Sequence, residues 1–118
     1  MRCINPVTIK KNLDPQLFPN GLQVPCGKCI QCRIQKRSEW SIRCLHELDN
    51  HADSVFVTLT YSDDNIPDNN SLRYQDLCLF FKRLRKNLGD RKIRYFACGE
   101  YGTDTNRPHY HAIIFGQL

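Results

Sequence analysis

Apolar residues between positions 30 and 48 recur at the spacing of one face of an α-helix. The stripe comprises Ile30, Ile34, Cys44, Leu45 and Leu48. Trp40 falls at the flank of this stripe. We therefore expect a helix over 30–48, with Trp40 packed in the core and not stacked on a ligand.

A second helical stripe follows a polar loop. Its apolar members are Leu77, Phe81, Leu84 and Leu88. Gly89 is expected to end this helix, because glycine is common just past a helix C-terminus. Ser71 is a candidate cap for its first turn, since a serine hydroxyl accepts hydrogen bonds from free backbone N–H groups. The pattern predicts a helix over 73–88.

Three further segments have the composition of β-strands: 54–61, 93–101 and 107–116. The first is almost continuously apolar, which is typical of a central strand. The third is bounded by Pro108 and Gly116 and is typical of a buried strand. Residues 102–107 are few enough to join two antiparallel neighbours. We expect an α+β fold: an antiparallel sheet with helices packed on one face.

The N-terminal region differs from the rest of the chain. It carries prolines at positions 6, 15, 19 and 25 and shows no clean periodicity. We expect short extended pieces at Cys3–Ile4 and Leu22–Val24 within an otherwise irregular arm. A chain of 118 residues allows one domain at most. The expected organisation is a Cys-rich arm over 1–29 and a domain over 30–118.

The formal net charge is +5, and the basic residues are clustered. Lys82, Arg83, Arg85 and Lys86 share the polar side of the second helix. Such clusters suit a polyanion, so these four residues are candidates for DNA binding. The simpler interpretation, a solvated helix face, stays open and is common for a charge run of this size.

Seven cysteines cannot all pair in disulfides. The chain has neither a secretory signal nor an apolar run of membrane length, so we expect a cytoplasmic protein without membrane contact. In that compartment metal binding is more common than disulfide formation. Cys26, Cys29 and Cys32 have the spacing of a zinc knuckle, which predicts a structural zinc site. The fourth ligand stays open among three candidates: Cys3, Cys44 and His46. Three reduced thiols without zinc are the alternative.

Two histidines stand two residues apart in the last predicted strand. His109 and His111 therefore project from the same face, and Tyr110 projects from the other. A hairpin places Glu100 at the same edge of the sheet. Two imidazoles and a carboxylate can hold one divalent ion with coordination positions left for a substrate. Alternatively, one histidine is a core residue and the other is solvated. A non-haem iron oxygenase uses similar ligands but is disfavoured by the rest of the sequence.

Taken together in order, several stretches resemble one known family. They are 24–33, 40–47, 56–61, 99–102 and 107–111. The chain resembles the replication initiation proteins of microviruses of the gokushovirus type, within the HUH endonucleases of rolling-circle replication. The resemblance covers the chain from Cys3 to its last residue.

The resemblance implies an enzyme that binds single-stranded DNA at a replication origin and nicks it through a tyrosine nucleophile. It implies a metal held by Glu100, His109 and His111, with Mn²⁺ or Mg²⁺ as the ion. Thr58 and Thr60 fall in the segment that matches the family's first motif. Host replication proteins are implied partners, and the implied fold is an RNA-recognition-like sheet.

One expected element of the family has no match. Its nucleophilic tyrosine lies on a helix beyond the histidine strand and is followed closely by a lysine. Tyr74 and Tyr101 do not fit that motif, and the other three tyrosines lie in strand segments. We therefore expect a truncated, amino-terminal part of an initiator, with an incomplete HUH core over 30–118. A non-catalytic nucleic-acid-binding module and an inactive phage-derived remnant in a bacterial genome are the alternatives.

Overall fold

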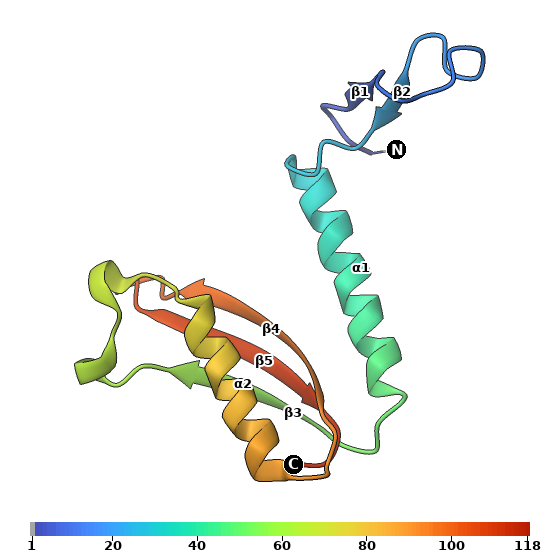
Figure 1. The fold of residues 1–118 in the computed structure, drawn as a ribbon. Coiled ribbons are helices and arrows are strands. Elements are labelled where there is room, and N and C mark those ends of the chain that lie inside the picture. Colours follow the sequence, from blue (N-terminus) through green and yellow to red (C-terminus); the bar gives the residue numbers. More distant parts are fainter. Residues whose placement is uncertain (1) are drawn as a thin grey trace. The chain divides into compact units, whose positions relative to one another are not determined.

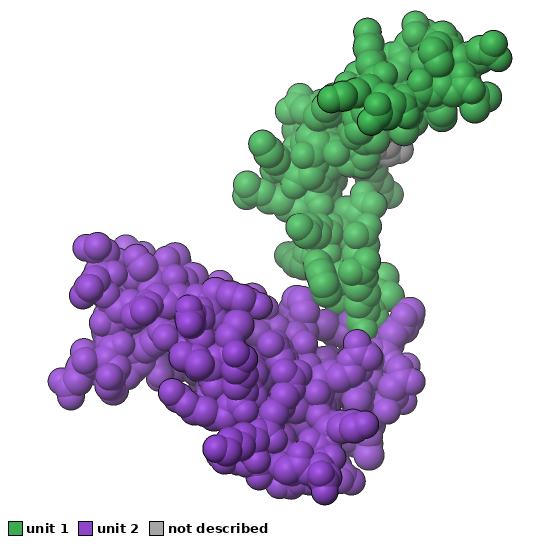
Figure 2. Space-filling view, viewed as in Figure 1, with its two compact units in different colours: residues 1–43 green, residues 44–118 purple. Residues whose placement is uncertain are grey.

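The computed structural model describes residues 2–118. The chain divides into two compact units, Met1–Arg43 and Cys44–Leu118, and Figure 2 shows them in different colours. The division falls inside helix α1, Ile30–Leu48. Each unit is described by itself below.

The first unit contains a small two-stranded sheet ahead of α1. Strand β1 (Val7–Ile9) pairs antiparallel with β2 (Leu22–Val24), and Val7 lies opposite Val24. The extended piece expected at Leu22–Val24 is confirmed. The one expected at Cys3–Ile4 is wrong, because Cys3 contacts other cysteines and the chain extends only from Val7 onward.

Trp40 is not a core residue, contrary to the expectation from its place beside the apolar stripe. Its side chain is 40 % exposed, and the guanidinium of Arg43 lies 4.8 Å from its ring centroid. A cation over an indole ring is favourable at a surface, so this contact gives the tryptophan a partner outside the core. The helix bounds themselves agree with the sequence pattern.

The second unit is built on a three-stranded antiparallel sheet with the order β3-β5-β4 (Figure 1). Its elements, in chain order, are β3 (Ser54–Thr60), two short 3-10 turns η1 (Asp63–Asn65) and η2 (Asp68–Asn70), α2 (Tyr74–Leu88), β4 (Arg94–Tyr101) and β5 (Pro108–Phe115). The expected α+β class is confirmed. Among residues 2–118, no helix is long and apolar enough to cross a membrane.

The central strand is β5, so the expectation that 54–61 forms the centre of the sheet is wrong. Residues of β3 alternate between exposed and half-buried, which is the pattern of a strand covered on one face only. In β5 every second residue from Pro108 to Ile114 is buried, and both neighbours pair with it. Burial along β5 therefore decides the order.

Helix α2 covers one face of this sheet (Figure 1). Phe81 is 1 % exposed and stacks on Tyr95 with ring centroids 3.5 Å apart. Ala112 and Ile114 of β5 belong to the same buried cluster. Ser71 does not cap α2, contrary to expectation: Arg73 occupies the N-cap position.

The opposite face of the sheet carries the remaining, alternate residues of the three strands. Thr58 and Thr60 of β3 are exposed there, as is Glu100 of β4. No member of the core cluster lies on this face within the described part of the chain. We call it the open face, and it includes the two histidines of β5.

Candidate metal centres and the open face of the sheet

The antiparallel register brings the three predicted metal ligands together on the open face. Glu100 of β4 lies directly opposite His109 of β5, and Cys98, two residues earlier, lies opposite His111. One carboxylate oxygen, Oε2 of Glu100, lies 3.4 Å from Nε2 of His109 and 3.0 Å from Nε2 of His111. The two imidazole rings stand almost perpendicular, with centroids 4.9 Å apart.

This arrangement fits the ligand set of a divalent ion. Two ligands at about 2.1 Å from an octahedral ion and at right angles to each other are about 3 Å apart. The two distances from Glu100 to the imidazole nitrogens are close to that value. Both histidines are half-buried while Glu100 is largely exposed, so coordination positions facing solvent are left for a substrate. The three side chains can thus hold a metal ion without rearrangement of the strands.

Each imidazole is oriented by a hydrogen bond at its other nitrogen. Nδ1 of His109 donates to the backbone carbonyl of Arg107 at 3.2 Å, which leaves Nε2 with its lone pair free. Nδ1 of His111 lies 3.0 Å from the hydroxyl of Thr58 on the neighbouring strand. Such outer contacts fix the ring orientation and tautomer of a metal-binding histidine. Thr58 and the Arg107 carbonyl are therefore functional groups that His-x-His spacing alone does not reveal.

Arg107 is itself fixed at the end of the hairpin. Its guanidinium donates to the carbonyl of Tyr61 at 2.6 Å and lies 2.7 Å from a carboxylate oxygen of Asp63. Its carbonyl also accepts the N–H of Gly102 across the hairpin loop. The backbone that orients His109 is therefore held from both sides.

The described tyrosines all lie away from the Glu100 and histidine group. Tyr110 projects to the α2 side, where its hydroxyl lies 3.0 Å from that of Tyr61 and bonds to the backbone of Arg73. The hydroxyl of Tyr101 accepts the N–H of Leu72. The two remaining tyrosines are a core partner of Phe81 and a residue of the first turn of α2: Tyr95 and Tyr74.

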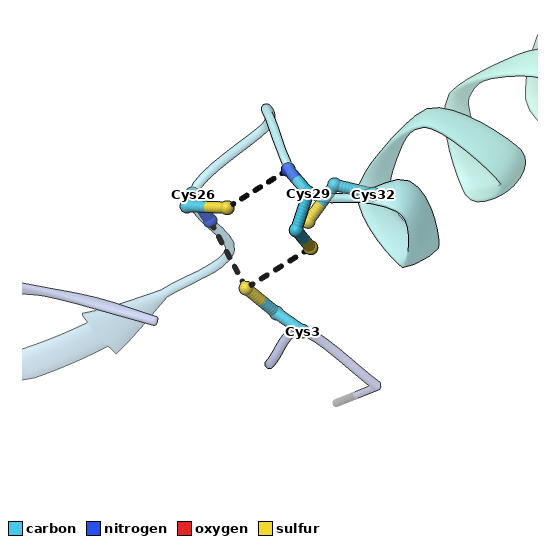
Figure 3. Close-up of side chains that lie close together, drawn as sticks. All are labelled: Cys3, Cys26, Cys29 and Cys32. Atoms are coloured by element: carbon cyan, nitrogen blue, oxygen red, sulfur yellow. Dashed lines mark hydrogen bonds between the residues drawn. The ribbon is translucent and has the colours of Figure 1, made fainter. Parts of the chain in front are cut away.

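A second group of metal-binding side chains lies in the first unit. Figure 3 shows Cys3, Cys26, Cys29 and Cys32 facing one another, with Cys32 in the first turn of α1. Their sulfur atoms all lie within 4.8 Å of one another, and those of Cys3 and Cys29 are 3.8 Å apart. Four thiolates around a tetrahedral zinc ion, each about 2.3 Å from it, are about 3.8 Å apart. Of the three candidates for the fourth position, the structure brings Cys3 to the cluster.

Backbone N–H groups around this cluster favour thiolates. The N–H of Cys29 lies 3.3 Å from the sulfur of Cys26 and lowers the pKa of that thiol. Hydrogen bonds from the backbone of Cys32 and Ile4 lower the pKa of Cys29 to about 6. The backbone of Gly27 favours the Cys32 thiolate, but burial and the neighbouring thiols outweigh it and raise the pKa of Cys32 to about 12. Cys26 and Cys29 are thus the thiols best prepared to bind a cation.

The four basic residues proposed for DNA binding are exposed on α2: Lys82, Arg83, Arg85 and Lys86. Because α2 covers the other face of the sheet, the structure does not bring them to the Glu100 and histidine group. The guanidinium of Arg85 lies 5.2 Å from the ring centroid of Tyr95 and so packs over the core. DNA binding by this face stays a prediction.

Comparison with known proteins identifies relatives over most of the chain. A family model for replication-associated proteins of the ORF2 type matches residues 54–118. The replication-associated protein VP4 of Bdellovibrio phage phiMH2K is 34 % identical over 98 % of this chain. The replication-associated protein ORF2 of Spiroplasma virus 4 is 41 % identical over 78 %, and the replication-associated protein ORF4 of Chlamydia phage 1 is 37 % identical over 79 %.

The matched region is only part of each relative. The chain spans 41 % of the phiMH2K protein, 31 % of the Spiroplasma virus protein and 24 % of the Chlamydia phage protein. No solved structure matches the chain. The matches agree with the resemblance to microvirus initiators seen in the sequence, and the chain belongs to the ORF2 family of phage replication-associated proteins.

Proposed function

We propose that this chain provides the metal-binding and DNA-binding part of a rolling-circle replication initiator. The observation that carries the proposal is the convergence of Glu100, His109 and His111 on the open face, in a chain of the replication-associated family. Its substrate is the single-stranded DNA of a replication origin, in the cytoplasm of the infected cell and together with host replication proteins.

The donor set favours a particular division of labour. Glu100, His109 and His111 would hold Mn²⁺ or Mg²⁺, and two imidazoles favour manganese of the two. When bound, such an ion neutralises charge on a non-bridging phosphate oxygen and orients the phosphodiester. The protein's own contribution is geometric: Thr58 and the Arg107 carbonyl fix the imidazoles, and the exposed side of Glu100 leaves room for a phosphate.

The complete nicking reaction also needs a nucleophile. None of the five tyrosines of the described chain has its hydroxyl in contact with the Glu100 and histidine group. This observation favours a second candidate function, a module that binds metal and single-stranded DNA without cleaving it. Strand cleavage in the sense of the family then requires a tyrosine from outside residues 2–118.

We further propose that Cys3, Cys26, Cys29 and Cys32 hold a structural zinc ion. The first unit has only two three-residue strands outside its helix, so few apolar contacts stabilise it. Removing zinc with a chelator should then lower the helical circular dichroism signal and expose the arm to protease. Cys26→Ser should have the same effect, whereas Cys44→Ser, a cysteine outside the cluster, should not. Equal zinc content in the two variants would refute the assignment.

Binding of a fluorescent single-stranded oligonucleotide, followed by anisotropy, tests the proposed function. We expect manganese to strengthen binding by the wild-type chain and to have no effect on Glu100→Gln. The matched control is Asp104→Asn, which removes the same charge from the nearby hairpin loop. Binding that is equally insensitive to manganese in all three proteins would refute the proposal.

A further inference from the structure

Phe56 is an exposed aromatic residue in the middle of strand β3. Its side chain is 64 % exposed, although the residues on either side of it, Val55 and Val57, pack against the core. Alternation along the strand places Phe56 on the open face, on the same side as Thr58 and the metal ligands.

Phe56 also contacts the candidate metal centre directly. Its ring stacks on that of His111, with centroids 5.4 Å apart and an angle of 21° between the planes. Along β3 it stands two residues from Thr58, which lies opposite His111 in the register. Two residues of a strand span about 7 Å, so the ring lies within reach of a nucleotide whose phosphate is held at the centre.

We propose that Phe56 is a stacking platform for one base of the single-stranded DNA whose phosphate is bound by Glu100, His109 and His111. The inference rests on the proposed function and adds to it the contact that binds the nucleoside. A flat aromatic ring accepts any base, because every base has a π-face. The contact therefore contributes affinity without sequence selectivity.

The surroundings of Phe56 favour a nucleic acid over a protein partner. The other exposed positions of β3 are hydroxyl residues: Ser54, Thr58 and Thr60. One aromatic ring among hydroxyls offers too little apolar area for a protein interface, but it suits a base whose sugar and phosphate are polar. Arg94 of β4, on the same face and 73 % exposed, provides a positive charge, although its Nε also lies 3.2 Å from Glu47.

Three variants of the full chain test the platform. The probe is a short oligothymidylate containing one 2-aminopurine, whose fluorescence falls when it stacks on an aromatic ring. We expect Phe56→Ala to bind it about five- to 150-fold more weakly in manganese and to lose the fluorescence decrease. Phe56→Trp should retain both. Tyr74→Ala removes an aromatic residue of similar exposure on α2 and should behave as the wild type.

The outcomes separate the platform from the proposed function. Weaker DNA binding by Phe56→Ala with unchanged manganese binding, measured by calorimetry, supports the platform. Equal DNA affinity and equal fluorescence for Phe56→Ala and the wild type overturn the platform and leave the metal-dependent function intact. Failure of the wild type to bind the oligonucleotide at any manganese concentration overturns both.

Discussion

At the scale of single residues, the open face is organised by the ring nitrogens of His109 and His111. Both Nε2 atoms face the same carboxylate oxygen of Glu100, and each Nδ1 has its own hydrogen-bond partner. A histidine whose Nδ1 donates a hydrogen bond presents Nε2 in the unprotonated form that binds metals. The metal-binding state is therefore built into the protein before an ion arrives.

The contact of Thr58 with His111 leads to a prediction about metal affinity. Replacing Thr58 by valine keeps the shape of the side chain and removes the hydroxyl that lies 3.0 Å from Nδ1 of His111. We expect Thr58→Val to bind manganese about 10- to 100-fold more weakly, because the ring loses its orienting partner. Isothermal titration calorimetry measures the change.

Thr60→Val is the matched control for that substitution. Thr60 lies on the same strand and the same face, opposite His109, but the Nδ1 of that histidine bonds to the Arg107 carbonyl. Thr60→Val should therefore keep the wild-type affinity. Equal losses in both variants would mean that the strand, not the hydroxyl, controls metal binding.

The residues of the candidate centre could be predicted from the sequence, but their orientation could not. Spacing placed His109 and His111 on one face, and the short connection to the preceding strand placed Glu100 beside them. The roles of Thr58 and Phe56 depend on the pairing of β3 with β5. Those residues are separated from the histidines by more than fifty positions, and only the register brings them together.

At the scale of elements, the sequence predicts lengths better than neighbours. The periodicity of 30–48 gives the observed bounds of α1, and the bounds of α2 differ by one residue at the start. The order of the strands was not predictable from apolar content, because β3 is rich in apolar residues and still lies at an edge. What places β5 in the centre is burial of its alternate residues against α2 and its pairing on both sides.

The packing of α2 on the sheet leads to a stability prediction. Phe81 is 1 % exposed and stacks on Tyr95, so its replacement by alanine leaves a cavity in the core. We expect Phe81→Ala to lower the free energy of unfolding by about 3 to 5 kcal/mol. Urea denaturation followed by circular dichroism measures it.

Leu79→Ala provides the comparison on the same helix. Leu79 is 38 % exposed and is not a member of the core cluster, so its loss should cost about 1 kcal/mol or less. If the two substitutions cost the same, the packing described for α2 would not be the main source of stability of the second unit.

At the scale of the whole molecule, the chain combines two units that suit different metals. The first gathers four thiols, which favour zinc, and the second gathers two imidazoles and a carboxylate, which also suit manganese. The chain spans less than half the length of each of the three phage relatives. The division of labour between these units and the remaining length of such proteins defines what this chain can do alone.

The placement of the tyrosines leads to a prediction about covalent chemistry. Because no tyrosine hydroxyl of residues 2–118 contacts the Glu100 and histidine group, we expect metal-dependent DNA binding without a covalent phosphotyrosine product. Incubation with radiolabelled single-stranded DNA and manganese, followed by a denaturing gel, checks this. A labelled protein band that survives denaturation would show that one of the tyrosines reaches the metal.

Calorimetric titration of manganese into the zinc-loaded chain tests the central claim most directly. Loading with zinc first occupies the cysteine cluster, so that manganese reports on the open face alone. We predict one manganese ion bound per wild-type chain and none in a His109→Ala, His111→Ala double variant that keeps the wild-type circular dichroism spectrum. Equal manganese binding by the two proteins would contradict the account.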